Sequence, residues 1–203
     1  MEDVGTARLE TFSDGVFAIA ATLLVLELGV DEPLHHSLGH ELLHLWPSYL
    51  AYATSFLTIG IMWVNHHACF ERIGRADRTL LFLNVLFLML VSFVPFPTRL
   101  VAEFLQEGGP NERAAAVAYG CTLTLTAILF NSLWLYATTG RRLVGANVPQ
   151  ERVDEITRTF APGVFLYGGG TGLAFVSPVA SIVVYLVVAL LYVPSASIFL
   201  RSR

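Results

Sequence analysis

Six stretches of this chain are each apolar over about 20 residues, the length that an α-helix needs to cross the hydrocarbon core of a bilayer. They cover residues 8–29, 46–69, 79–101, 113–138, 159–176 and 179–200. Inside a bilayer every backbone N–H and C=O needs an internal partner, so such stretches form helices. Only 14% of the 203 residues are charged, against about 25% in an average soluble domain. The sequence therefore predicts an all-α, polytopic membrane protein with one six-helix domain over residues 1–203.

The placement of arginine predicts how these spans are oriented. The chain has 12 arginines and no lysine, and ten of them lie in the N-terminal segment, the second and fourth connections, and the C-terminal tail. The other two, Arg99 and Arg113, lie near the third connection. Because arginine and lysine accumulate on the cytoplasmic side of a membrane, both termini are expected in the cytoplasm. The longest cytoplasmic connection, residues 140–158, is expected to include a short amphipathic helix after Pro149.

The first span carries charged and polar residues inside an apolar run, RLETFSDGVFAIAATLLVLEL. An Asp or Arg near the centre of a span costs about 2.5–3.5 kcal/mol, so these residues need a function or a partner. On a helix that turns 100° per residue, five residues of this span lie within about 40° of one line along the helix axis. This face presents small and aliphatic groups with a single hydroxyl. The residues on this line are Arg8, Gly15, Ile19, Thr22 and Leu26.

This line has two interpretations. If copies of the helix surround a central axis, Ile19 and Leu26 form apolar rings about 10 Å apart, with Thr22 between them. Apolar rings of this kind can gate a pore by dewetting. The alternative is a helix that simply packs in a bundle, and helical periodicity alone does not separate the two.

Polar side chains from three spans are expected to lie at similar depth toward the cytoplasmic side. They are Ser13 and Asp14 in the first span, Trp63, Asn65, His66 and His67 in the second, and Asn84 in the third. Two kinds of role remain open for them. One is a proton relay or a metal site, and the other is a hydrogen-bond network that pins the helices together, which buried polar groups in lipid require in any case.

Two further patterns are weaker. The outer loop HHSLGHELLH places His36, His40 and His44 four residues apart, so that on a helix they share one face and could bind zinc or sense pH. The glycine-rich run YGGGTG at 167–172 lacks the Lys-Ser/Thr of a phosphate-binding loop and is not a TVGYG filter. We interpret it as close helix packing through small residues.

The combination Arg8-x-x-x-Phe12-Ser13-Asp14 at the start of the first of six spans resembles the endolysosomal potassium channel family and its prokaryotic homologues. RxxxFSD is a short pattern, but its placement in the first span of a six-span chain makes it specific. The resemblance covers the whole chain, since it includes the six helices per repeat, the RxxxFSD signature and the polar Trp/Asn/His cluster of the second span. The chain is thus similar to a prokaryotic member of that family.

The resemblance implies a cation channel in the plasma membrane of a prokaryote, with K⁺ as the permeant ion and without a cofactor. Animal members carry two such repeats and dimerise, so a chain with one repeat is expected to form a homotetramer in the lipid bilayer. The implied pore is lined by the first helix, and its narrow points match Ile19, Thr22 and Leu26. The motif residues would hold that helix against its neighbours: these are Arg8, Phe12, Ser13 and Asp14, with Trp63, Asn84 and either His66 or His67 as partners.

Aliphatic rings offer no oxygen ligands, so they can exclude or gate monovalent cations but hardly select K⁺ by coordination. The four Thr22 hydroxyls supply about one oxygen layer, whereas a carbonyl filter supplies several. We therefore expect only modest K⁺ preference over Na⁺. Acidic residues at the outer side, Glu27, Asp31 and Glu32, would concentrate cations at the mouth.

Three other function classes compete with the channel. The first is a proton-coupled carrier in which Asp14 exchanges protons with His66 or His67. The second is an intramembrane enzyme using Asp14 and His66, which is disfavoured because no nucleophile or set of metal ligands converges. The third is a non-conducting scaffold, against which the polar face of the first span argues. No nucleic-acid partner is expected, and the sequence does not indicate what opens a pore.

Overall fold

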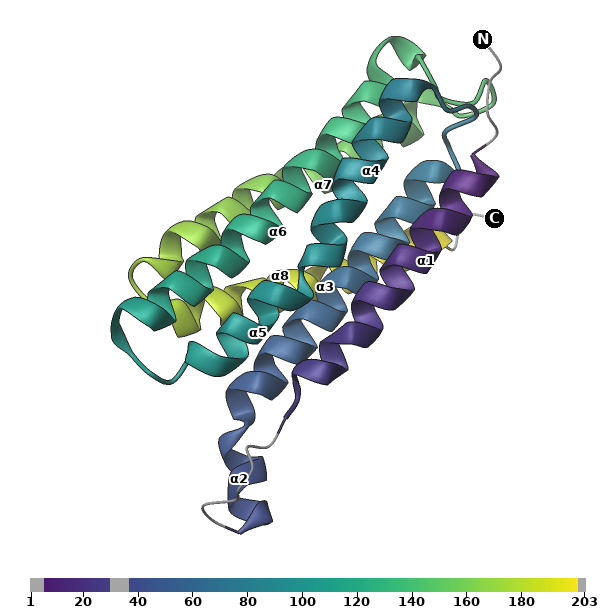
Figure 1. Ribbon diagram of the computed structural model, residues 1–203. Coiled ribbons are helices and arrows are strands. Elements are labelled where there is room, and N and C mark those ends of the chain that lie inside the picture. Colours follow the sequence, from purple (N-terminus) through teal and green to yellow (C-terminus); the bar gives the residue numbers. More distant parts are fainter. Residues whose placement is uncertain (1–5, 30–36, 201–203) are drawn as a thin grey trace.

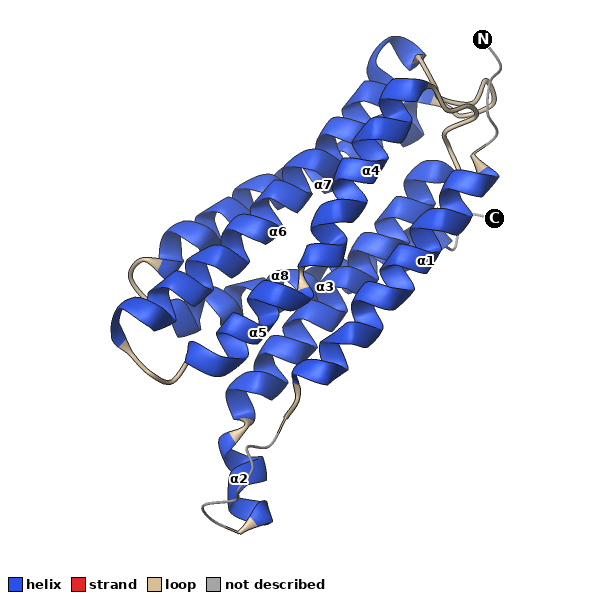
Figure 2. Ribbon diagram, in the orientation of Figure 1, coloured by secondary structure: helices blue, strands red, loops and turns tan. Residues whose placement is uncertain are grey.

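The structure is a computed structural model that describes residues 6–29 and 37–200, and within these ranges the regular elements are helices arranged as a bundle (Figures 1 and 2). The α-helices are α1 (Ala7–Leu23), α2 (Leu38–His44), α3 (Trp46–Phe70), α4 (Arg78–Phe93), α5 (Pro95–Phe104), α6 (Gly109–Thr138), α7 (Gln150–Ala174) and α8 (Pro178–Leu200). Two short 3₁₀ segments continue them, η1 (Leu24–Glu27) and η2 (Thr139–Arg141). The prediction of an all-α protein is confirmed.

Three helical segments of the described chain are long and apolar enough to cross a membrane: Ala7–Glu27, Arg78–Phe104 and Gly109–Arg141. Helices also cover the predicted second, fifth and sixth spans, as α3, α7 and α8. The connection between α3 and α4 and that between α6 and α7 lie at the same end of the bundle as the start of α1 (Figure 1). The arginine-rich connections and the start of α1 thus lie at one end of the bundle, as the arginine pattern predicts. The count of six spans stays a prediction.

The predicted third span is divided at Val94 into α4 and α5. Pro95 and Pro97 lie in the first turn of α5, where their missing N–H groups leave carbonyls of the preceding turn without helical donors. The Val94 N–H compensates for part of this loss, because it donates to the Val91 carbonyl, the group that Pro95 leaves without its donor, at 3.2 Å. The α4–α5 break is thus a proline effect inside one membrane-length segment, Arg78–Phe104.

The short amphipathic helix predicted after Pro149 does not exist as a separate element. Residues 150–158 form the first turns of α7, which runs without interruption from Gln150 to Ala174 through Pro162. The prediction was wrong because it ended the polar segment where the apolar pattern begins. A helix that emerges from the membrane changes composition along its length without ending there, and α7 continues even through Pro162, which lacks a backbone N–H.

Helix α1 ends earlier than the predicted first span. Its α-helical hydrogen bonding stops at Leu23, the next four residues form η1, and Leu28 is extended with φ −90° and ψ 93°. A 3₁₀ segment turns about 20° further per residue than an α-helix. The line drawn through Ile19, Thr22 and Leu26 at 100° per residue therefore bends at its outer end.

Glycines of α6 and α7 let these helices approach α8 closely. A Cβ on Gly170 would lie 2.5 Å from Cε1 and 3.0 Å from Cζ of Tyr185, a residue that is completely buried. Across the same contact the hydroxyl of Ser181 donates to the Gly170 carbonyl at 2.9 Å. The structure thus assigns Gly170 of the YGGGTG run to tight helix packing, as the small-residue interpretation required.

The α3–α4 connection and the α6–α7 connection, at the end of the bundle where α1 starts, are joined by backbone hydrogen bonds. The Gly74 N–H donates to the Leu143 carbonyl at 2.9 Å, and the Gly145 N–H donates to the Arg72 carbonyl at 2.9 Å. Asp77 caps α4 by accepting from the Leu80 N–H at 2.9 Å. Burial opposes ionisation of Asp77, but hydrogen bonds from the Leu80 N–H and the Tyr136 hydroxyl outweigh it and hold its pKa below the usual value. This end of the bundle is therefore tied together by backbone contacts between distant segments.

Candidate pore face and its anchoring network

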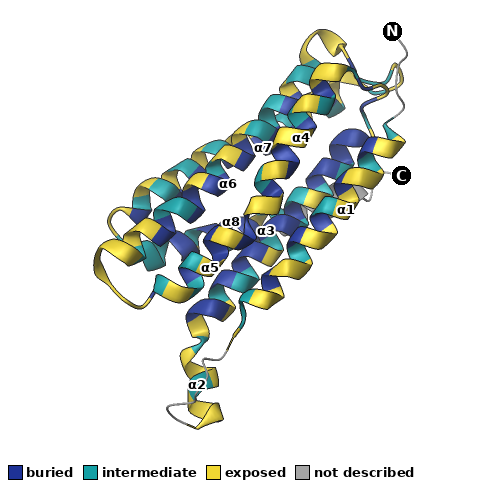
Figure 3. Cartoon of the chain, in the orientation of Figure 1, coloured by how far each residue is buried: buried dark blue, intermediate teal, exposed yellow. Residues whose placement is uncertain are grey.

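One face of α1 points away from the bundle (Figure 3). Ile19 is 61% exposed and Leu26 72% exposed, and Thr22 is exposed between them. Arg8 and Gly15 of the same predicted line are exposed as well. The structure thus places the whole predicted line on one outward surface, which we call the α1 face (Arg8, Gly15, Ile19, Thr22 and Leu26). Leu23 and Val25 beside it are also exposed.

The opposite side of α1 is anchored by a buried chain of hydrogen bonds. The Asn84 side-chain amide donates to the Ser13 hydroxyl at 3.0 Å, and that hydroxyl donates to the Leu9 carbonyl at 2.8 Å. The Asn84 side-chain oxygen lies 2.8 Å from Nε2 of His66. With its amide group committed to Ser13, Asn84 accepts from His66, so His66 carries its proton on Nε2. Helices α1, α3 and α4 are joined by this one asparagine.

Asp14 has a different partner. Nε1 of Trp63 donates to Asp14 Oδ1 at 2.8 Å, which ties α1 to α3 at the edge of the α1 face. An indole N–H can only donate, so this contact satisfies a carboxylate without a second charge. The proton-exchange hypothesis requires a contact between Asp14 and a histidine. Among the hydrogen bonds of the described residues, none joins Asp14 to a histidine.

The two adjacent histidines of α3 have separate environments. His66 is 1% exposed, while Nε2 of His67 lies 3.6 Å from Glu71 Oε1 near the end of α3. The sequence could not say which histidine meets the motif, and the structure assigns His66, through Asn84, to Ser13.

Three phenylalanines enclose the His66 ring and were missed at the level of the sequence. The ring centroids of Phe17, Phe70 and Phe87 lie 5.5, 4.3 and 5.8 Å from that of His66. A signal for them was present, because Phe17 follows Ser13 by four residues, Phe70 follows His66 by four, and Phe87 follows Asn84 by three. Residues so spaced share a helix face. The hydrogen bonds of the network are therefore shielded by aromatic rings.

Other predicted members of the cluster lie elsewhere. Phe12 is 57% exposed, and it lines a surface groove together with Arg8 and Thr11, away from the buried chain. Asn65 is 9% exposed and lines a partly open pocket with Thr126 and other residues of α6 and α7. Of the RxxxFSD motif, Ser13 and Asp14 thus hydrogen-bond to residues of α4 and α3 that were predicted as partners.

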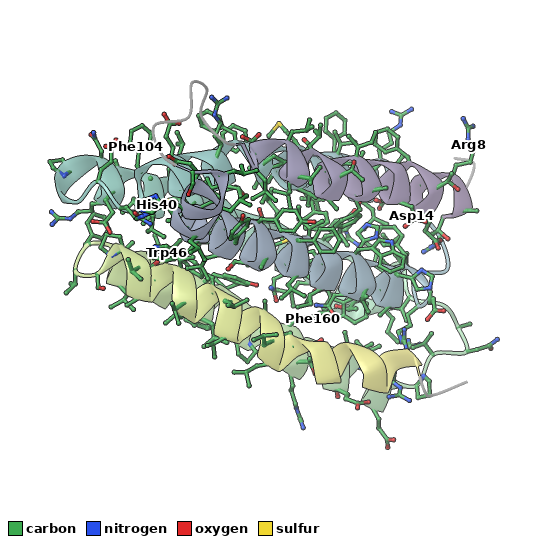
Figure 4. The ribbon with its side chains drawn as sticks, turned by 90° about the horizontal axis from the view of Figure 1, so that it is seen from below. Arg8, Asp14, His40, Trp46, Phe104 and Phe160 are labelled. Carbon is green, nitrogen blue, oxygen red and sulfur yellow. The ribbon has the colours of Figure 1, made fainter. Side chains whose placement is uncertain are left out.

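At the far end of α1 the predicted acidic mouth is partly neutralised. Glu27 Oε2 lies 3.8 Å from Nε of Arg99, which also reaches Glu103 at 3.9 Å. Asp31 and Glu32 lie outside the described residues. The side-chain view places Arg8 and Asp14 toward one end of the bundle, and His40, Trp46 and Phe104 toward the other (Figure 4).

This arrangement determines what α1 can do. Helix α1 is fixed by buried hydrogen bonds on its Ser13 side. Its exposed α1 face is therefore held in a constant orientation toward its surroundings. From Gly15 to Leu26 that surface combines apolar side chains with one hydroxyl, Thr22 Oγ1, whose proton is donated to the Ile19 carbonyl at 2.9 Å. The hydroxyl oxygen is therefore left as an acceptor, suited to a cation.

Comparison with known proteins is consistent over most of the chain. The family model described as endosomal/lysosomal potassium channel TMEM175 matches residues 8–95. A potassium channel of Chamaesiphon minutus is 46% identical over 94% of this chain and 95% of its own length. The crystal structure of a lysosomal potassium-selective channel TMEM175 homologue from the same organism superposes with a TM-score of 0.83 at 45% identity, covering 94% and 97% of the two chains.

A more distant relative extends the comparison to animals. The endosomal/lysosomal proton channel TMEM175 of Gallus gallus is 36% identical over 67% of this chain, but the match spans only 29% of that relative's length. The relatives of this chain thus include a potassium channel of similar length and part of a larger chain named as a proton channel.

Proposed function

Because this chain belongs to the TMEM175 family of endosomal/lysosomal potassium channels, we propose that it is a passive, K⁺-permeable channel whose pore is lined by the α1 face. The channel resides in the plasma membrane of a prokaryote with both termini in the cytoplasm. The observation that carries the proposal is the two-sided character of α1. Its Ser13 side is fixed by buried hydrogen bonds, whereas Ile19, Thr22 and Leu26 are exposed.

The channel is a homotetramer in which the α1 faces of four subunits surround the axis. A groove of about 380 Å³ between α1 and α3 supports packing of a second copy beside this face. Its lining includes the small residues Ala18, Ala21 and Gly60, and small residues are typical of helix–helix interfaces in membranes because they let backbones approach. The monomer thus leaves both the proposed pore lining and its border uncovered.

Conduction in this channel is limited by apolar side chains, and selectivity comes from one oxygen layer. Ile19 and Leu26 form the constriction, which excludes ions when it dewets. Thr22 supplies the hydroxyl oxygens between them, and these favour K⁺ over Na⁺ only modestly. A proton-coupled carrier using Asp14 and His66 finds less support, because Asp14 bonds Trp63 and His66 bonds Asn84.

A flux assay on the purified protein in liposomes tests the proposal. With defined gradients of K⁺, Na⁺ or H⁺, we expect K⁺ flux to exceed Na⁺ flux by a small factor, with a reversal potential set by the ion gradients alone. The H⁺ flux tests whether this chain conducts protons, as the name of its animal relative states for that protein. Protein that conducts no monovalent cation at any pH or voltage would contradict the channel, and stoichiometric coupling to protons would favour the carrier.

Thr22→Val is expected to reduce the K⁺/Na⁺ permeability ratio several-fold, toward unity. The substitution keeps the shape of the side chain but removes the hydroxyl oxygen that is left as an acceptor for a cation. Reversal potentials in mixed K⁺ and Na⁺ measure the ratio directly. Thr159→Val is the matched control, since this threonine of α7 also donates to a carbonyl of its own helix, that of Glu155 at 3.0 Å. An unchanged ratio in Thr22→Val would remove Thr22 from the ion path.

A further inference from the structure

Helix α2 carries two histidines that neither the pore nor the anchoring network uses. It projects from the bundle at the end of α3 opposite the start of α1 (Figures 1 and 4). His40 and His44 are exposed on it, and their spacing of four residues puts both side chains on one face of the helix. Both rings are accessible to ions in solution.

The two imidazoles lie within hydrogen-bonding distance of each other. Nε2 of His40 lies 3.1 Å from Nε2 of His44, and the ring centroids are 4.2 Å apart. A zinc ion binds each histidine nitrogen at about 2.0–2.1 Å. Two nitrogens on one ion are therefore separated by roughly 2.8–3.4 Å for ligand angles between octahedral and tetrahedral values. The observed separation falls inside that interval without any movement of the helix.

Surrounding contacts hold this pair in place. The His44 carbonyl accepts from the side-chain amide of Gln106, in the connection after α5, at 3.5 Å. The Glu41 carbonyl accepts from the Leu45 N–H at 3.1 Å, which closes the last turn of α2 against the start of α3. The histidine pair is thus presented by a short helix that is tied at its base to two other segments.

We propose that His40 and His44 form a two-histidine binding site for a divalent transition-metal ion of the Zn²⁺ class. Neutral imidazole is the ligand such ions favour, whereas Mg²⁺ and Ca²⁺ prefer oxygen. No group of three or more His, Cys, Asp or Glu side chains that could hold a metal occurs among the described residues. His36, the third histidine of the pattern predicted from the sequence, lies outside the described residues. Within the described residues the site is a pair of imidazoles, which leaves further coordination positions of the ion open to water.

Isothermal titration of untagged protein with Zn²⁺ at pH 7.5 tests the site. We expect one saturable Zn²⁺ per chain, weakened at least about tenfold by either His40→Ala or His44→Ala, because each removes half of a chelate. Leu43→Ala is the matched control: Leu43 lies on the same helix, is 79% exposed and supplies no ligand, so its isotherm should equal that of the unsubstituted protein. Titration at pH 5 should lose the binding, because protons compete for imidazole.

Two results would overturn the site. One is an unchanged isotherm in the double variant His40→Ala/His44→Ala that elutes from gel filtration like the unsubstituted protein. The other is equal binding of Mg²⁺ or Ca²⁺, which would indicate oxygen ligands. Since the readout is binding, the outcome is independent of whether the protein conducts K⁺.

Discussion

Asn84→Ala is expected to lower the free energy of unfolding by about 2–4 kcal/mol. Asn84 is completely buried and links His66 of α3 to Ser13 of α1. A side-chain hydrogen bond between membrane helices contributes on average about 0.6 kcal/mol, but leaving a buried donor or acceptor without a partner costs about 1–3 kcal/mol. Alanine leaves the His66 N–H without a partner among aromatic rings, whereas the Ser13 hydroxyl keeps its bond to the Leu9 carbonyl. The second effect therefore dominates.

The measurement is the midpoint of thermal unfolding in detergent, which should fall by roughly 4–16 °C for a domain of this size. Asn131→Ala is the matched control, since Asn131 donates only to the Ala127 carbonyl of its own helix α6 at 2.9 Å. It should cost less than about 1 kcal/mol. Equal shifts for the two variants would show that Asn84 is not the residue that joins α1, α3 and α4.

Ile19→Ser is expected to raise K⁺ flux by about tenfold or more. In the proposed tetramer it replaces an apolar ring by four hydroxyls, which keeps water in the constriction and lowers the barrier to ions. A barrier lower by about 1.4 kcal/mol already corresponds to a tenfold higher rate. Because Ile19 is 61% exposed, the substitution leaves the packing of the subunit nearly unchanged.

The control for this prediction is Val85→Ser on α4, where the side chain is 52% exposed on a helix outside the proposed pore. Liposome flux under the same K⁺ gradient compares the two variants. If the α1 face contacts lipid instead of the ion path, both substitutions will leave the flux at the level of the unsubstituted protein. A flux increase confined to Ile19→Ser supports the pore assignment.

The helices could be predicted well because the bilayer allows few alternatives. Apolar length and the need to satisfy every backbone group specify α-helices, and α3, α6 and α8 begin and end within a few residues of the predicted limits, except that α6 begins four residues early at Gly109. The errors are local. Prolines after Val94 divide the third span, and η1 shortens α1, whereas average hydropathy over a window detects neither.

The candidate site was only partly predictable. Ser13, Asp14, Trp63, His66 and Asn84 could be named because polar residues in lipid need partners. Their pairing could not, since it depends on the rotation of α1, α3 and α4 about their axes. The contacts of the phenylalanines with His66 were not predicted, because hydropathy does not distinguish one apolar residue of a span from another.

The sequence by itself determined that this chain forms apolar helices, and its RxxxFSD motif pointed to the family. Both properties follow from local chemistry, namely the length of apolar runs and the identity of a few residues. Only the tertiary structure decided that Trp63 bonds Asp14, that His66 rather than His67 reaches Ser13 through Asn84, and that His40 and His44 lie within hydrogen-bonding distance of each other. These contacts depend on a few ångströms of separation between side chains, and helix packing alone sets that separation.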